Sequence, residues 1–235
     1  MFGAPRARTP DEEECRLAAT EILKINPENP EPSLITYAAE QIRRGHVLGM
    51  PTDTFYGLAA DPYNVRAVDR VYEIKSRSYN KPLSLLISSI DQAEELASDL
   101  PREFYLLAER FWPGPLTIIV RAAPRLPLKV TANSGNVAIR IPAAKIPVEV
   151  IRKAGVPVTA TSANLSGESE CTTAKGVHQQ LGARVSIIVD GGESPRDVAS
   201  TIVDLTQDGI GQSPWRIQRE GAIPAQQIMD VLSGK

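Results

Sequence analysis

Three cations lie close together in the sequence, at Lys75, Arg77 and Lys81. They follow a stretch of helical periodicity, and cations favour the negative end of a helix dipole, so a solvated helix end is one explanation. Lys81, however, directly precedes Pro82 and a continuous apolar run that is typical of a buried strand. Because cations placed just before a buried strand can form charge-assisted hydrogen bonds, we expect the cluster to bind an anionic group.

A fourth cation, Arg140, stands inside segment 137–141, whose other members are valine, alanine and isoleucine. A charge in such a strand is costly unless an anion accompanies it. A single buried salt bridge would compensate the charge of Arg140, and so would an anionic ligand. The sequence leaves both interpretations open.

Small polar side chains stand at further predicted strand ends. Ser162 and Asn164 follow a strand at 156–160, Thr54 follows one at 46–50, and Ser200 precedes one at 201–205. Residues of this kind often stabilise turns, which is the simpler interpretation. They are also short hydrogen-bond donors that suit phosphate oxygens, and ligands of α/β proteins bind at strand ends.

Strands and helices alternate along most of the chain, which predicts an α/β fold with a twisted, mixed, open sheet flanked by helices. Ser33 and Asn64 are predicted to cap the first two helices, and Gly45 to end the first. The other predicted helices are 91–97, 102–111, 148–153, 174–181 and 224–232. The other predicted strands are 83–87, 116–120, 137–141, 185–189 and 215–219.

Residues 1–31 are rich in proline and predict an N-terminal tail, with a short helix-capable piece at 12–23; residues 32–235 form the predicted domain. The N-terminus has no apolar segment of the signal-peptide type. No apolar run approaches the roughly 18 residues that a membrane span needs. The two cysteines, Cys15 and Cys171, have no metal-ligand spacing, so we expect a reducing, cytoplasmic setting.

The net charge of −2 disfavours a dedicated nucleic-acid-binding protein, so anion binding must be local. Only two histidines occur, which disfavours histidine-centred catalysis. The phosphate-binding loop, the zinc-protease motif and the serine-hydrolase elbow are all absent from the sequence.

Seven blocks follow one another between residues 33 and 223, and they are Pro51–Leu58, Lys75–Leu83, Pro113–Thr117, Ala138–Pro142, Thr161–Gly167, Asp190–Gly192 and Ser200–Asp204. Together they resemble the YrdC-like family of threonylcarbamoyl-AMP synthases (TsaC type). Seven blocks in the family's order are far more specific than any single block. Two departures are Ser76, where many members carry glycine, and Ser78, where many carry proline.

The resemblance implies a single α/β domain with a basic concave face. It implies an enzyme that converts L-threonine, bicarbonate and ATP to threonylcarbamoyl-AMP and pyrophosphate, with Mg²⁺ arriving with ATP. A threonylcarbamoyl transferase complex (TsaD, TsaB, TsaE type) would then modify tRNA; a weak tRNA contact is allowed and no membrane association is expected.

The resemblance also assigns site residues. The catalytic set that it implies is Lys75, Arg77, Ser162 and Asn164. The L-threonine-binding set is Thr54, Leu86, Arg140, Ala160 and Ser200. The ATP-binding set is Arg77, Lys81, Asn136, Ser162 and Arg219, and no residue is assigned to a metal.

Two alternative functions compete with this one. An RNA-binding module could use the same basic cleft, but 12 aromatic residues are few for an extended stacking surface. A carbamoyl-phosphate-handling domain of the hydrogenase-maturation type shares the fold, but the zinc-finger and acylphosphatase-like segments are absent.

Overall fold

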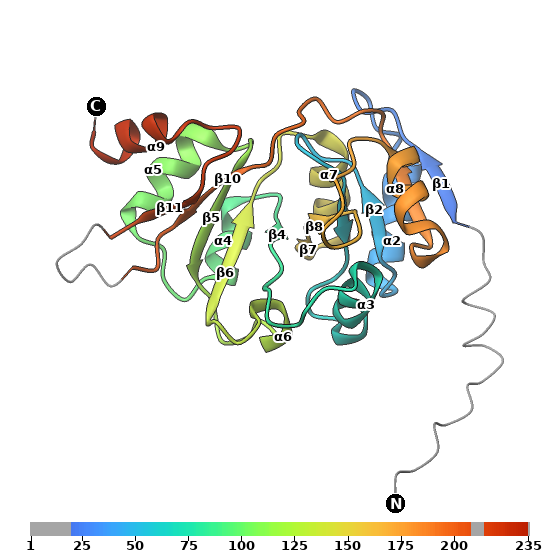
Figure 1. Cartoon of the computed structure of the whole chain (residues 1–235), viewed down its shortest axis with the longest axis horizontal. Coiled ribbons are helices and arrows are strands. Elements are labelled where there is room, and N and C mark those ends of the chain that lie inside the picture. Colours follow the sequence, from blue (N-terminus) through green and yellow to red (C-terminus); the bar gives the residue numbers. More distant parts are fainter. Residues whose placement is uncertain (1–19, 208–213, 235) are drawn as a thin grey trace, which may run out of the picture.

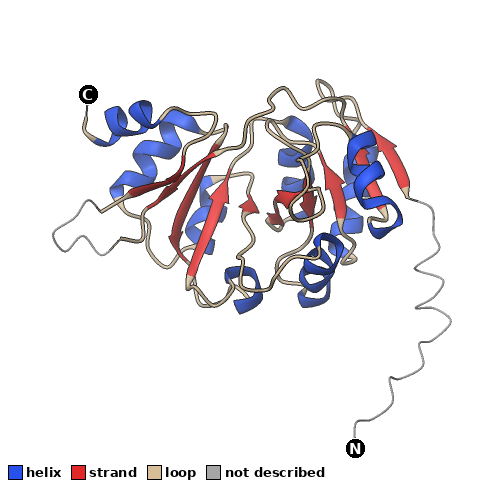
Figure 2. Cartoon of the chain, viewed as in Figure 1, coloured by secondary structure: helices blue, strands red, loops and turns tan. Residues whose placement is uncertain are grey.

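The computed structural model describes residues 20–207 and 214–234 (Figure 1). Its strands form two mixed sheets, with the orders β1-β9-β2-β3-β8 and β11-β10-β5-β6-β4-β7. Figure 2 shows the strands running between flanking helices. The predicted α/β class, with mixed sheets flanked by helices, is confirmed, while hydrogen bonding divides the strands into two sheets where one was expected.

The first sheet consists of β1 (Glu21–Lys24), β9 (Ile187–Asp190), β2 (Leu48–Met50), β3 (Gly57–Ala59) and β8 (Thr161–Ser162). The second consists of β11 (Arg216–Arg219), β10 (Thr201–Asp204), β5 (Leu116–Arg121), β6 (Asn136–Arg140), β4 (Leu85–Leu86) and β7 (Val158–Thr159). Most of these strands were predicted, with bounds that differ by a few residues.

The helices are α2 (Pro32–Arg43), α3 (Val65–Lys75), α4 (Ile90–Leu96), α5 (Arg102–Phe111), α6 (Leu128–Thr131), α7 (Lys145–Ala154), α8 (Ala174–Leu181) and α9 (Ala225–Leu232), with a short 3₁₀ turn at Gly182–Arg184. In Figure 1, α5 and α9 lie beside β10 and β11, whereas α2 and α8 lie beside β1 and β2. None of the helices in the described ranges is long and apolar enough to cross a lipid bilayer.

The predicted boundary between a tail and a domain at residue 32 is not what the structure shows. Strand β1 lies within the predicted tail and pairs in parallel with β9, from Glu21 opposite Ile187 to Lys24 opposite Asp190. It escaped prediction because it is an edge strand in which Leu23 alone is buried. Residues 12–19 of the helix-capable piece lie outside the described residues.

Strand β3 was also missed, because its sequence Gly-Leu-Ala has weak strand propensity. It pairs with β2 on one side and β8 on the other, both antiparallel. The tight return from β2 to β3 confines residues 51–56 to one end of the first sheet. This return brings the Pro-Thr-Asp-Thr segment to the site described below.

Helix α3 forms as its sequence predicts. The Asn64 side chain accepts hydrogen bonds from the backbone N–H groups of Arg66 and Ala67, which are free donors at a helix start. Ala67, Val68, Val71 and Ile74 face the core at helical spacing. The helix ends at Lys75, so the cationic cluster begins where the helix stops.

Ser76 follows α3 in the left-handed conformation, with φ of 50°. A residue with a Cβ atom pays roughly 1–2 kcal/mol there, and glycine does not. We therefore expect Ser76→Gly to raise the free energy of unfolding by about 0.5–1 kcal/mol, after the greater entropy of glycine in the unfolded chain is subtracted. Urea denaturation measures the difference. Ser78→Gly, two residues on, is the control and should not stabilise; equal gains in both variants would contradict the explanation.

Candidate active site

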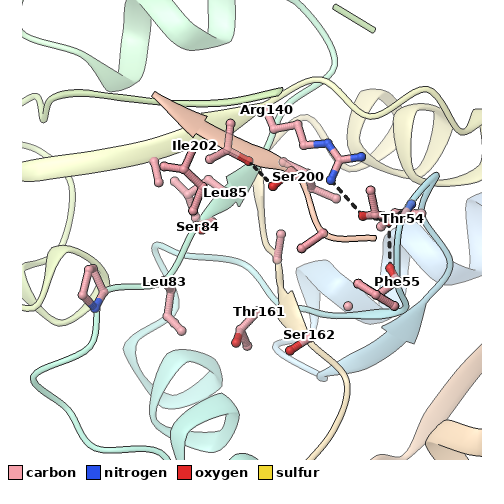
Figure 3. Close-up of a pocket in the computed structure, with 18 of the residues that line it drawn as sticks. Thr54, Phe55, Leu83, Ser84, Leu85, Arg140, Thr161, Ser162, Ser200 and Ile202 are labelled. Atoms are coloured by element: carbon pink, nitrogen blue, oxygen red, sulfur yellow. Dashed lines mark hydrogen bonds between the residues drawn. The ribbon is translucent and has the colours of Figure 1, made fainter. Parts of the chain in front are cut away.

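A cavity of about 480 Å³ opens between the two sheets (Figure 3). This volume suits a small-molecule ligand. Its walls come from the β2–β3 connection, residues 77–86, β5, β6, β8, the start of β10 and β11. The polar and charged lining residues are Thr52, Thr54, Tyr56, Arg77, Lys81, Ser84, Thr117, Arg140, Thr161, Ser162, Glu170, Ser200, Gln218 and Arg219.

Strand alternation decides which side chains reach the cavity. Thr117 and Ile119 of β5 line it, whereas Ile118 between them is buried in the core. Ala138 and Arg140 of β6 follow the same rule. Successive side chains of a strand point to opposite faces, so the second sheet offers one face to the core and the other to the cavity.

Arg140 is buried and its guanidinium has three protein partners. Nε donates to the carbonyl oxygen of Gly114 at 2.9 Å, Nη1 donates to Thr54 Oγ1 at 3.0 Å, and Nη2 donates to Asp53 Oδ1. Burial lowers the pKa of Arg140, and the Asp53 carboxylate opposes that shift. Both interpretations of Arg140 from the sequence therefore remain relevant: a buried salt bridge exists, and the side chain also lines the cavity.

The Thr54 hydroxyl sits between Arg140 and Thr52. Thr52 Oγ1 donates to the carbonyl oxygen of Phe55 at 2.7 Å, so in its 3.1 Å contact with Thr54 it acts as the acceptor. Thr54 thus donates to Thr52 and accepts from Arg140 (Figure 3). Its remaining lone pair is an acceptor at the cavity wall.

The cationic strap, defined as residues 76–82, contributes Arg77, Lys81 and Pro82 to the cavity lining. Arg77 donates through Nη2 to the carbonyl oxygen of Pro82 at 3.1 Å, which closes the strap on itself. The Tyr72 hydroxyl donates to the carbonyl oxygen of Lys81 at 2.9 Å, and its ring packs on Tyr79 with centroids 4.6 Å apart. Helix α3 therefore holds the two cations of the strap that line the cavity.

The cavity is strongly basic. Its lining carries the cations Arg77, Lys81, Arg140 and Arg219, against the one carboxylate of Glu170. Arg77 is partly buried, and this withdrawal from water lowers the pKa of its guanidinium. Such an arrangement favours a ligand with several negative charges.

Arg219 reaches the cavity from the end of β11. Its Nε and Nη2 donate to the carbonyl oxygen of Ser200 at 3.1 and 2.8 Å, and Nη2 also contacts Ser200 Oγ at 3.2 Å. Gly221 permits this approach, since a Cβ atom there would collide with the backbone of Ala199 and Ser200.

Lys75 lies behind the cavity wall. Its ammonium donates to the carbonyl oxygen and Oδ1 of Asn164, each at 2.9 Å, and to the carbonyl oxygen of Ser162. Burial and the charge of Arg77 lower the pKa of Lys75 to about 8. Ser162 Oγ in turn donates to Asn164 Oδ1 at 2.6 Å, so Lys75 and Asn164 fix the turn that presents Ser162 to the cavity.

A family model, Sua5/YciO/YrdC, described as "Telomere recombination", matches residues 40–221. The chain belongs to the Sua5/YciO/YrdC family. The curated relatives include proteins named threonylcarbamoyl-AMP synthase from Pyrococcus abyssi, 38% identical over 198 residues, and from Bacillus subtilis, 41% identical over 199 residues. Each alignment covers 84% of this chain but only 57% and 56% of those relatives, so the chain spans little more than half their length.

Among solved structures, that of Pyrococcus abyssi Sua5 complexed with L-threonine superposes with a TM-score of 0.86. It is 37% identical in sequence, and the match covers 91% of this chain and 61% of that one. The family assignment predicted from the seven sequence blocks is thereby confirmed.

Of the residues that the Sua5/YciO/YrdC resemblance assigned, most converge on the cavity. Those that line it are Thr54, Arg77, Lys81, Leu86, Arg140, Ala160, Ser162, Ser200 and Arg219. Lys75 and Asn164 lie behind its wall, where they hold Ser162. Asn136 is not among the lining residues: it begins β6, at the end of the strand away from Arg140, and its Nδ2 contacts Thr206 Oγ1 at 3.4 Å.

Sequence reasoning missed several residues of the Sua5/YciO/YrdC site, and Asp53 and Thr117 are two of them. Asp53 pairs with Arg140 and lies 3.7 Å from Nη1 of Arg196. Thr117 lines the cavity and contacts Ser200. The signal for Thr117 was its hydroxyl within the otherwise apolar Leu-Thr-Ile-Ile-Val segment; nothing in the sequence joined Asp53 to residues so distant.

Metal ligands are sparse around this site. Within residues 20–207 and 214–234, no three His, Cys, Asp or Glu side chains gather as a metal-binding group. Glu170 is the acidic member of the described cavity lining. A divalent cation would therefore depend on its other ligands, such as phosphate oxygens and water.

Proposed function

We propose that this protein is a threonylcarbamoyl-AMP synthase, a nucleotidyltransferase that converts L-threonine, bicarbonate and ATP to threonylcarbamoyl-AMP and pyrophosphate. The observation that carries the proposal is one cavity with two chemically distinct parts. Arg140, Thr54 and Ser200 form one part, and Arg77, Lys81 and Ser162 form the other. The names of the relatives and the threonine-bound Sua5 support it.

The first part suits an amino acid. The Arg140 guanidinium has more N–H groups than its three protein partners use, and the spare donors suit an α-carboxylate. Thr54 offers an acceptor for an amine or hydroxyl, and Leu86 and Ala160 line the wall beside it. We assign L-threonine to this part.

The second part suits a triphosphate. Arg77, Lys81 and Arg219 supply positive charge. The Ser162 hydroxyl lies in the wall of this part, where its bond to Asn164 Oδ1 fixes its position. In the proposed reaction the threonine amine adds to carbon dioxide derived from bicarbonate, losing a proton to form a carbamate. A carbamate oxygen then attacks the α-phosphorus, and the bond from that phosphorus to the bridging oxygen breaks as pyrophosphate leaves.

Both reactants are anions, so the task of the protein is to overcome their repulsion and align them. Fixed cations and donors achieve this without a covalent intermediate. Lys75 and Asn164 act by positioning Ser162, and direct ATP contacts are assigned to the other residues; Asn136 is left out of this set. Mg²⁺ is proposed to arrive as part of MgATP, held chiefly by phosphates and water.

The downstream partner is proposed to be a threonylcarbamoyl transferase complex acting on tRNA, in the cytoplasm. The RNA-binding alternative lacks a specific observation in its favour. The aromatic residues of the described cavity lining are Phe55 and Tyr56, and Tyr56 is buried.

The test is to incubate the protein with MgATP, bicarbonate and labelled threonine. We expect labelled threonylcarbamoyl-AMP, together with pyrophosphate release that requires threonine, because the cavity aligns both substrates. Mass spectrometry of the product and a coupled pyrophosphate assay measure these. A reaction lacking bicarbonate is the control. RNA binding with a steep salt dependence and no turnover would instead favour the alternative.

A further inference from the structure

Thr117 carries the only hydroxyl of β5, and this hydroxyl contacts the hydroxyl of Ser200 at the cavity wall. The two hydroxyl oxygens are 2.8 Å apart, and both residues are buried. The contact follows from sheet register, since β5 and β10 run in parallel with Thr117 opposite Ile202, which places Ser200 just before the paired segment. No other hydrogen bond of the Thr117 side chain is found among the described residues.

Ser200 therefore has neighbours on both sides. Thr117 approaches from β5 and Arg219 from β11, whose Nη2 is 3.2 Å from Ser200 Oγ and 2.8 Å from its carbonyl oxygen. Arg219 can only donate. If Thr117 also donates, both lone pairs of Ser200 Oγ are occupied and its own proton is free for an oxygen in the cavity.

This arrangement joins the two parts of the cavity. A ligand oxygen that accepts the Ser200 proton polarises the Ser200 hydroxyl, which then accepts more strongly from Arg219; hydrogen bonds in such chains reinforce one another. Arg219, so held, presents its remaining N–H groups in one direction. Binding of the amino acid thus orients the Arg219 guanidinium for binding of the nucleotide.

We propose that Thr117 is a positioning residue, which through Ser200 and Arg219 couples binding of the amino acid to binding of the nucleotide. The proposal rests on the function proposed above. It predicts that a threonine-saturated protein binds ATP more tightly than the free protein, and by linkage that ATP tightens threonine by the same factor. In this scheme Thr117, at the cavity wall, acts through its hydrogen bond with Ser200.

The experiment is isothermal titration with the α,β-methylene analogue of ATP, which cannot release pyrophosphate, in the absence and presence of saturating L-threonine. For the unmodified protein we expect threonine to tighten the analogue by about fivefold or more, the lower end of typical coupling. Thr117→Val keeps the shape and the strand propensity but removes the hydroxyl. In this variant we expect the factor to fall to about one, while each ligand alone still binds within a few-fold of the original affinity.

The matched control is Thr159→Val. Thr159 is also a buried strand threonine, whose Oγ1 donates to the carbonyl oxygen of Leu58 at 2.8 Å, but it does not line the cavity. This variant should keep the full coupling. Circular dichroism confirms that both variants are folded.

Two results would overturn the inference while leaving the proposed function intact: undiminished coupling in Thr117→Val, or binding of both ligands to the unmodified protein without any coupling. Failure of the unmodified protein to bind either ligand would instead overturn the proposed function, and the inference with it. The two failures are therefore distinguishable.

Discussion

Replacing Arg77 by alanine is expected to reduce threonine-dependent pyrophosphate release by roughly 10²- to 10³-fold, the usual cost of removing a donor that stabilises developing charge. Arg77 lines the nucleotide part of the cavity and stands at the start of the cationic strap. Its loss removes both a cation beside the phosphates and the bond from Nη2 to Pro82 that closes the strap.

The Arg77→Ala protein should remain folded, because the side chain is only partly buried and pairs with backbone carbonyl groups alone. L-threonine should bind to it almost normally. Arg66→Ala is the control, since Arg66 is an exposed arginine of α3, the helix that precedes the strap, and does not line the cavity. Arg77→Lys separates charge from geometry: a lysine keeps the charge but not the planar fork. An unchanged rate in Arg77→Ala would refute the phosphate role.

The second large effect is expected at Arg140. Alanine is a poor test there, because it would leave the Asp53 carboxylate buried without its partner, at a cost of roughly 3–5 kcal/mol in stability. Arg140→Lys keeps a positive charge beside Asp53 but cannot form two parallel bonds with a carboxylate. Hydrogen bonds to charged groups contribute about 1.5–3 kcal/mol, so we expect threonine affinity to fall roughly 10- to 100-fold.

Affinity for the ATP analogue, measured without threonine, should change by no more than a few-fold in Arg140→Lys. Calorimetric titration of each ligand alone gives the comparison. Arg196→Lys is the matched control: Arg196 also contacts Asp53, through Nη1 to the backbone oxygen at 3.3 Å, but does not line the cavity. Equal weakening of threonine and nucleotide by Arg140→Lys would contradict the carboxylate assignment.

Local sequence signals predicted most helices, but α6 was missed and Ser33 does not cap α2, which begins at Pro32 after the N-cap residue Glu31. Asn64 caps α3, and α8 has the predicted bounds Ala174–Leu181, because capping and helical periodicity depend on residues close in sequence. Strands β1 and β3 escaped because each is short and stabilised by partners distant in the chain. For β1 that partner is β9, and for β3 one partner is β8.

The site shows the same division. A charge inside an apolar strand correctly marked Arg140 as unusual, but its pairing with Asp53 joins residues that only the folded chain brings together. For Lys75 the sequence indicated an anion site and could not show that the ammonium points away from the cavity, toward Asn164. The sequence shows which positions carry a cationic side chain, whereas packing in the folded chain decides where that side chain points.

The pairing of β1 with β9 also bears on how the chain folds during synthesis. Ribosomes add about 5–20 residues per second, so β1 leaves the ribosome on the order of 10–30 s before β9 exists. Contacts between such distant segments form slowly, since the loop must close before the pairing can stabilise it. Among the described strands, the first to be synthesised is thus one of the last to be paired. During that interval β9 does not yet cover Leu23 and Ile25, which are buried in the finished protein.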